Sequence, residues 1–390
     1  MSNQNASATD LQEKARAVPP MAKDKAAVAP AVQRWVYMDV CKIVAFVLIV
    51  FTNIVSGVWG IAETGSSEWV VLNVYNGLSR FSVPLFFLML GALLLNPLKE
   101  LSIKEIYLKF LLPVLTAFLF WSTAYVLFTY AIYSPGNFAH FNLREFISTV
   151  LQGDPYRHWF VFLIAQLYLV LPFLRAIAKN LSACRCFLVL WMIFTLFVTT
   201  LNRIPAVFQL SPVATAFVYE PLGILSRIRP AMVIDYIGYA VLGYYIHSCN
   251  ISRKAGTPAL IVFAASLLYT IVMSHFLSVK TGAPNELFFE NLSFNNAISA
   301  ASFMVAMKAF SENVWYKDRT YDIILFFSAG AFGLFMTHAF VLRLLDVIGL
   351  NGLSFGALLS TPILCVIVTL ISVTASYLIK KIPGVGDYLV

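Results

Sequence analysis

Ten apolar stretches separated by polar connections are the feature that most constrains this chain. The first begins near Arg34, and the others lie at 70–95, 104–133, 158–178, 184–201, 229–248, 257–277, 294–311, 323–347 and 355–379. Each has, or nearly has, the roughly 20 residues that a helix needs to cross a bilayer. The sequence therefore predicts an all-α integral membrane protein with about ten transmembrane helices. A soluble core is excluded, because 60% of the residues are hydrophobic and only 12% are charged.

The segments between and around these stretches define the expected domains. Residues 1–33 are rich in Ala, Lys, Asp and Pro and predict a disordered cytoplasmic tail. No short apolar region with a cleavage site precedes the first helix, which we interpret as an uncleaved signal anchor. One membrane domain is expected over 34–381, followed by a short cytoplasmic tail over 382–390. The segment 202–228 is not assigned as a further span, because three prolines interrupt it.

Loop charges predict the orientation of the chain. Lys and Arg recur in alternate connections, at 99–104, 179–185, 253–254, 317–319 and 380–381. Because cytoplasmic loops carry the excess of positive charge, both termini are predicted to be cytoplasmic. The exception is the segment around 202–228, which contains Arg203 and Arg227. The net charge of +8 thus reports orientation and gives no reason to expect nucleic-acid binding.

The first helix carries a polar seam through an apolar run. Asp39, Lys42 and Asn53 fall within about 60° of arc at 100° per residue, and the seam climbs about 20 Å. Polar groups in hydrocarbon usually mark function. Two plainer interpretations remain open: Asp39 and Lys42 as interfacial anchors that reach water, and Asn53 as a hydrogen-bonding contact between helices.

Two further side chains in the membrane region are candidates for chemistry. Arg80 lies about 15 Å into the second helix, and an arginine at that depth needs a wet cavity or a partner, for which Asp39 is one candidate. Pro84 is expected to kink the helix beside it. His338 lies near the midplane of the ninth helix and is either a proton carrier or a packing residue.

Other polar residues give weaker signals. His158 and Trp159 are interpreted as either an aromatic-belt anchor or a functional pair, and His247 shows no supporting neighbours in the sequence. The sequence contains no Gly-rich phosphate loop, no cluster of metal ligands and no Gly-x-Ser-x-Gly elbow. The five cysteines have neither zinc nor disulfide spacing. No metal site and no bound cofactor are therefore predicted.

Several motifs together resemble the membrane acyltransferases of family 3, particularly the branch of surface-polysaccharide O-acetyltransferases that includes the enterobacterial common antigen enzyme. The motifs extend over nearly the whole membrane domain: Tyr37-Met-Asp39-Val-Cys-Lys42, Ser79-Arg80-Phe-Ser-Val-Pro84, His158-Trp159-Phe-Val-Phe, Gly238-Tyr-Ala-Val-Leu-Gly243 and Gly333-Leu-Phe-Met-Thr-His338. The resemblance implies an inner-membrane enzyme that moves an acyl group, usually acetyl from cytoplasmic acetyl-CoA, to a sugar hydroxyl.

The resemblance also implies partners and a site. The acceptor would be a lipid-linked saccharide or growing exopolysaccharide, in a bacterial inner membrane, with membrane lipids and the polysaccharide synthesis machinery as neighbours. The candidate catalytic residues are His338 as proton carrier, Arg80 as oxyanion donor and Asn53 as a group that orients the thioester. The candidate substrate-binding residues are Asp39, Lys42, Ser79, His158 and Trp159.

The chain departs from the family pattern at three positions. Lys42 stands where the family typically has arginine, Asn53 where it has an essential histidine, and Leu90-Gly91 where it has Ser-Gly. Asparagine cannot act as a general base. Three explanations stay open: the chemistry has moved, with His338 as the best candidate, the chain has lost acyl transfer, or the asparagine is a variant substitution.

Two rival functions follow from these departures. A degenerate homologue would transport, flip or scaffold glycan intermediates, and the loss of the helix-one histidine favours it. A secondary transporter is disfavoured, because no inverted repeat is visible in the sequence.

Overall fold

The computed structural model describes residues 35–97, 99–133, 142–152, 159–228, 235–311, 318–384 and 386–389. The chain divides into two units, Met1–Trp35 and Val36–Val390, and all elements below belong to the second. The predicted disordered tail over 1–33 and the candidate residue His158 lie outside the described residues.

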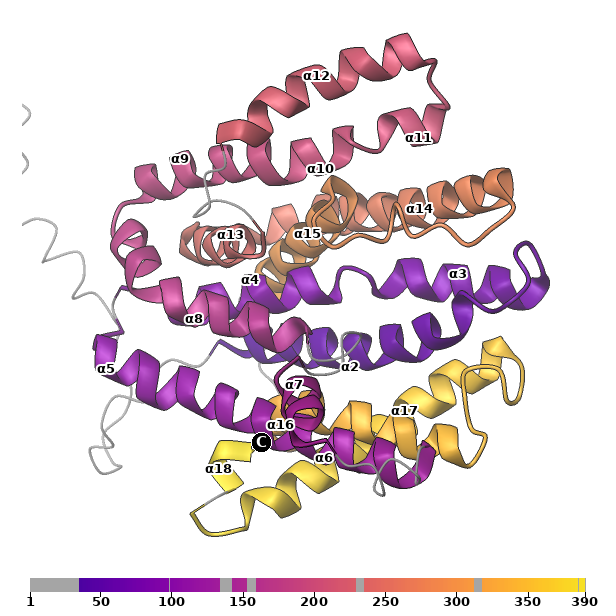
Figure 1. The fold of residues 1–390 in the computed structure, drawn as a ribbon. Coiled ribbons are helices and arrows are strands. Elements are labelled where there is room, and N and C mark those ends of the chain that lie inside the picture. Colours follow the sequence, from indigo (N-terminus) through magenta and orange to yellow (C-terminus); the bar gives the residue numbers. More distant parts are fainter. Residues whose placement is uncertain are drawn as a thin grey trace, which may run out of the picture. The chain divides into compact units, whose positions relative to one another are not determined.

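The described residues form helices and contain no strand, which confirms the predicted all-α class (Figure 1). The first helices are α2 (Val36–Trp59), α3 (Ser67–Ser79), α4 (Ser82–Leu94), α5 (Ile103–Glu105), α6 (Leu112–Tyr133), α7 (Leu143–Gln152), α8 (Trp159–Ala178), α9 (Leu181–Trp191) and α10 (Val198–Leu201). The others are α11 (Ile204–Phe208), α12 (Pro212–Ile228), α13 (Ile237–Ser248), α14 (Gly256–Thr281), α15 (Phe294–Ser311), α16 (Asp318–Val347), α17 (Ala357–Lys380) and α18 (Gly386–Leu389). Two π-helical turns, Ile106–Leu111 and Met192–Phe197, continue α5 into α6 and α9 into α10.

Eight helical stretches among the described residues are long and apolar enough to cross a bilayer. They are Val36–Trp59, Ser67–Leu94, Ile103–Ile132, Trp159–Ala178, Leu181–Phe208, Arg253–Thr281, Arg319–Val347 and Ala357–Lys380. Each coincides with one of the predicted apolar runs. The chain is therefore an all-α integral membrane protein.

The two remaining predicted spans are helical but differ from the other eight. The run 229–248 contains α13, which has 12 residues and begins at Ile237, and residues 229–234 lie outside the described part. The run 294–311 is α15, whose first turns carry Asn295, Asn296 and Ser299 on buried positions. The segment 202–228, left unassigned from the sequence, contains α11 and α12, and α12 includes Pro221 within the helix.

Helix α2 lies at the centre of the packing. It contacts α3 and α4 on one side and α16 and α17 on another, and α14 and α15 pack beyond α3 and α4. In Figure 1, α2 and α3 lie between the α13–α15 group and α16–α17. The first helix, which carries the polar seam, is thus enclosed by helices from both ends of the sequence.

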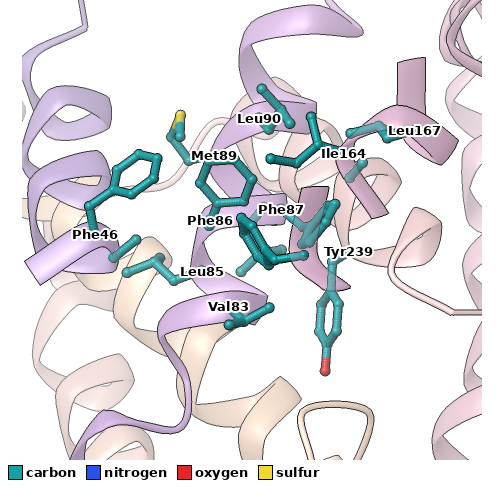
Figure 2. Packing of buried hydrophobic residues seen from close by; sticks show 14 of the residues in the cluster. Phe46, Val83, Leu85, Phe86, Phe87, Met89, Leu90, Ile164, Leu167 and Tyr239 are labelled. Atoms are coloured by element: carbon teal, nitrogen blue, oxygen red, sulfur yellow. The ribbon is translucent and has the colours of Figure 1, made fainter. Parts of the chain in front are cut away.

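Helix α4 forms the apolar centre beside α2. Twelve of its 13 residues are buried, so it behaves as a helix surrounded on all faces. Figure 2 shows Phe86 and Phe87 of α4 in the same buried cluster as Ile164 and Leu167 of α8. Four phenylalanines from four helices close a circuit, with ring centroids 5.1 Å apart for Phe46–Phe86, 4.9 Å for Phe86–Phe160, 4.8 Å for Phe160–Phe335 and 5.9 Å for Phe335–Phe46. This aromatic circuit fixes α16 against α2.

Two glycines allow α4 and α13 to touch through their backbones. A Cβ atom at Gly91 would lie 1.9 Å from the Ala240 carbonyl oxygen, and one at Gly243 would lie 1.8 Å from the Leu88 carbonyl oxygen. No side chain fits at either distance, so only glycine permits this crossing. Gly91, the glycine of the Leu90-Gly91 pair, therefore has a packing role.

The short helix α18 packs against α6. Trp121 of α6 donates a hydrogen bond from Nε1 to the Leu389 carbonyl oxygen at 3.0 Å, and Leu389 is buried. The last described residues of the predicted tail over 382–390 are thus attached to the helical bundle.

Candidate active site

The candidate site centres on a direct contact between α2 and α16. Asn53 Nδ2 lies 2.8 Å from His338 Nε2, although the two residues are 285 positions apart. The other ring nitrogen, His338 Nδ1, lies 2.5 Å from the Phe335 carbonyl oxygen. The two residues singled out separately in the sequence therefore form one hydrogen-bonded pair.

The second contact determines the tautomer of His338. A carbonyl oxygen only accepts hydrogen bonds, so Nδ1 must carry the proton that points at Phe335. In the neutral imidazole Nε2 then has a lone pair, and Asn53 must donate its amide N–H to it. The structure thus presents His338 Nε2 as an oriented base whose lone pair is held by Asn53.

The surroundings keep this imidazole in place. His338 is 1% exposed, and its ring lies 5.6 Å from that of Phe335, a member of the aromatic circuit. Asn53 is partly exposed and Ser56, one turn further along α2, is exposed. His338 is thus buried, whereas its hydrogen-bond partner Asn53 is partly exposed.

Arg80 lies at the break between α3 and α4, and Pro84 explains this break. Helix α3 ends at Ser79 and α4 begins at Ser82. Pro84 has no N–H for the carbonyl of Arg80 four residues earlier, and its ring would clash with that carbonyl. The expected kink is thus a break, centred four residues before the proline.

The Arg80 guanidinium is fixed by several contacts. Nε donates to Asn76 Oδ1 at 2.7 Å and Nη2 donates to Ser56 Oγ at 3.3 Å. Nη2 also lies 3.9 Å from Glu286 Oε1, and the guanidinium carbon stands 5.0 Å from the centre of the Phe289 ring. Its side chain is 14% exposed. Charge, hydrogen bonds and an aromatic face together stabilise this cation within the membrane domain.

These contacts correct the suggestion that Asp39 pairs with Arg80. The guanidinium reaches Ser56, which lies about 25 Å along α2 from Asp39 at 1.5 Å per residue. Asp39 is instead buried against α16, where its Oδ1 accepts a hydrogen bond from Ser328 Oγ at 2.5 Å. Asp39 therefore has its partner on α16, whereas Arg80 contacts the other end of α2 through Ser56.

One face of α2 connects Arg80 with His338. Asn53 and Ser56 are three residues apart, so they lie on the same face about 4.5 Å apart along the axis. Asn53 contacts His338 and Ser56 contacts Arg80. A base and a cation thus flank a single helical turn, an arrangement suited to removing a proton on one side and stabilising negative charge on the other.

The other predicted substrate-binding residues are more dispersed. Ser79 is fully buried and its hydroxyl donates to the Asn76 carbonyl oxygen at 3.2 Å. Trp159, 37% exposed, lies against Phe160 and Tyr236. Lys42 is partly buried on α2.

His247 has neighbours that its sequence context did not reveal. Tyr37 Oη lies 2.6 Å from His247 Nδ1. Lys308, 9% exposed, donates from Nζ to the carbonyl oxygens of Ile246 at 3.1 Å, His247 at 2.7 Å and Cys249 at 2.5 Å. A cation at the end of α13 satisfies carbonyls that a helix leaves unpaired. The sequence did not indicate Lys308, Ser56 or Asn76 as site residues. For Ser56 and Asn76, the available signal was their helical spacing from Asn53 and from Arg80.

Among the described residues, no three His, Cys, Asp or Glu side chains gather as they would around a metal ion. In a comparison with known protein families, a family model described as an acyltransferase domain matches residues 35–380, which include every residue of the candidate site. No curated protein and no solved structure matches the chain.

Proposed function

The chain belongs to the membrane acyltransferases of family 3, and on this premise we propose that it transfers acetyl from acetyl-CoA to a sugar hydroxyl of a surface glycan. The observation that carries the proposal is the oriented His338, whose Nε2 lone pair faces Asn53 at 2.8 Å. A buried imidazole with a fixed tautomer is a general base prepared for use.

The proposed reaction is a direct acyl transfer. His338 Nε2 removes the proton of the acceptor hydroxyl as the oxygen attacks the thioester carbon. The C–S bond breaks, an oxygen ester forms, and the proton passes from His338 to the leaving thiolate, which departs as the CoA thiol. Negative charge develops on the thioester oxygen during the attack and must be stabilised.

Asn53 and Arg80 would supply this stabilisation. The acceptor hydroxyl has to replace the Asn53 amide at Nε2, and the released N–H can then point at the thioester oxygen. Arg80, a planar cation held one turn away, provides further donors for the same charge. Asn53 thus acts in this proposal as an oxyanion donor in place of the family's histidine.

The donor would approach from the cytoplasmic end of α2. Lys42 lies near that end, and the basic loops predicted on the same side would attract the phosphates of CoA. Asp39 and Ser79 would position the helices along this route, and Trp159 would lie on the acceptor side. The protein would reside in a bacterial inner membrane, where cytoplasmic acetyl-CoA and a lipid-linked saccharide or exopolysaccharide meet.

The hydrogen bond between Asn53 and His338 also favours one alternative function. If Asn53 never releases Nε2, the chain is a catalytically inactive relative that transports, flips or scaffolds glycan intermediates. The two functions differ in whether acetyl leaves CoA.

Radiolabelled acetyl-CoA supplied to inverted membrane vesicles tests the proposal. Vesicles containing the chain should transfer label to the glycan fraction, and vesicles containing the His338→Gln variant should not. If vesicles with the stably inserted chain transfer no label, the acyltransferase proposal is wrong and the scaffold alternative gains support.

A further inference from the structure

A cavity adjoins the 286–290 segment, which also contacts Arg80. It has a volume of about 120 Å³ and is formed by the end of α10, α11, the second half of α14 and the start of α15. Following the predicted orientation, these helix ends belong to the outer face. This volume is close to the roughly 150 Å³ of an engineered cavity that binds benzene, so the cavity has about the size of one six-membered ring.

Arg203 is the charged residue that lines this cavity, and it forms an ion pair with a carboxylate. Arg203 is 6% exposed and pairs through Nη2 with Glu290, whose side chain is 59% exposed. The structure gives the other guanidinium nitrogens of Arg203 no hydrogen-bond partner among the described residues. A buried cation beside a half-exposed carboxylate offers both donors and acceptors with no net charge, and Glu290 would repel an added anion.

Uncharged polar groups line the same cavity. Thr200 lines it, and its buried hydroxyl has no hydrogen-bond partner among the described residues. Asn295 uses its Nδ2 for Thr270 Oγ1 and the Phe288 carbonyl oxygen, both at 2.8 Å, which leaves its Oδ1 as an acceptor. A buried hydroxyl without a partner usually marks a site for water or a ligand.

The walls of the cavity are aromatic. Tyr269, Phe288 and Phe294 line it, and the rings of Tyr269 and Phe288 lie 5.8 Å apart. Sugar rings present C–H groups on their faces and hydroxyls at their edges. Aromatic walls with a few placed polar groups match both features, as in many small-ligand sites.

We propose that this cavity binds one neutral sugar unit of the acceptor glycan, adjacent to the unit that is acylated. The proposal rests on the proposed function only for its role in acceptor recognition, because the binding itself can be measured without acyl transfer. A lipid phosphate or an acidic sugar fits less well, since Glu290 already neutralises Arg203.

The 286–290 segment connects this cavity with Arg80. Glu286 and Phe289 contact Arg80, whereas Phe288 lines the cavity and Glu290 pairs with Arg203. The backbone between them is fixed, because the Phe288 carbonyl oxygen accepts from Asn295. One short segment thus separates the proposed sugar subsite from the residue proposed to stabilise the oxyanion.

Saturation-transfer NMR on the full chain in nanodiscs tests the binding. The probes are the methyl glycosides of glucose, galactose and N-acetylglucosamine, with methyl glucuronide and inorganic phosphate as charged comparisons. At least one neutral glycoside should receive saturation, and Met273→Trp, which fills the cavity, should reduce the signal at least tenfold. Arg203→Gln should do the same, and the matched surface variants Met192→Trp and Arg185→Gln should leave it unchanged.

The acyl-transfer assay then assigns the role. Met273→Trp and Arg203→Gln should raise the KM for the glycan about tenfold and leave the KM for acetyl-CoA unchanged. Saturation that persists in both variants, saturation of the charged probes alone, or no saturation at all overturns the proposed subsite. Glycoside binding without acetyl transfer in the parent chain supports the site and refutes the proposed enzyme function, so the two failures are distinguishable. Arg203→Gln decides the result if Met273→Trp does not insert.

Discussion

Replacing His338 by glutamine separates the base from the hydrogen bond that holds it. The glutamine Oε1 takes the place of Nε2 and can accept the Asn53 amide, but it cannot remove a proton. The substitution should therefore leave α2 in contact with α16 and abolish only proton transfer.

The magnitudes of the two effects differ enough to be measured. Loss of a positioned general base lowers kcat by about 10²–10⁴, equivalent to about 3–5 kcal/mol of barrier. The structural cost is the lost bond from Nδ1 to the Phe335 carbonyl, about 1–3 kcal/mol. Because native proteins have about 5–15 kcal/mol of stability, the variant should still fold.

The assay compares kcat for label transfer with the thermal midpoint of the purified protein. The matched control is His275→Gln on α14, where the imidazole lies against the Trp69 ring at 5.7 Å and outside the site. His338→Gln should lose activity at a nearly unchanged KM for acetyl-CoA, and the control should keep it. Parental kcat in a folded His338→Gln protein would refute the assignment of His338 as the base.

Four further predictions follow from the site, the packing and the loop charges. Asn53→His should change transfer little if His338 is the base, and a rise of about 10²–10⁴ in kcat would show instead that the missing imidazole limits the reaction. Arg80→Ala should lower kcat by about 10²–10³ with the protein still inserted, and Lys should restore little because an ammonium lacks the planar fork. Gly243→Ala should cost at least about 1–3 kcal/mol of unfolding free energy by denaturation, because its Cβ meets backbone. A phosphatase fused after Lys381 should be inactive and one fused near residue 140 active, with the reverse pattern contradicting the predicted orientation.

Hydropathy was sufficient to predict most of the helices, since each must satisfy its own backbone and present apolar side chains to lipid. It identified α13 and α15 as ordinary spans and missed how they differ. Helix α15 places Asn295 and Ser299 on buried positions, where partners on α14 accept or donate. Those partners come from tertiary packing, which a hydropathy average does not describe.

The break at Arg80 shows that a sequence can correctly predict a helix distortion from a proline without fixing the residue at which the distortion lies. Pro84 was expected to bend the helix nearby, and the bend falls where its missing N–H leaves a carbonyl unpaired. The partners of the guanidinium could not be predicted, because Glu286 and Phe289 come from a connection more than 200 residues away. The depth of Arg80 in the membrane predicted that its guanidinium has a partner, but it did not indicate which residue this partner is.

Arg203 shows that an exception to a sequence rule can carry information. It belonged to the one connection whose positive charge opposed the predicted orientation. The structure buries this arginine beside Glu290 at the proposed sugar subsite, so its charge is paired within the protein.

The pair of Asn53 and His338 gives the departure from the family pattern a physical meaning. The sequence flagged each residue alone, one as a lost imidazole and the other as a lone histidine, and their spacing of 285 positions concealed the contact. An asparagine at position 53 still donates an N–H to Nε2 of His338. Unlike the family's histidine, its side chain cannot accept a proton. The substitution therefore leaves a single base at the contact instead of two. If the chain is active, proton removal and proton return must both pass through His338, and no variant at position 53 that lacks a proton-accepting group should rescue the loss of that histidine.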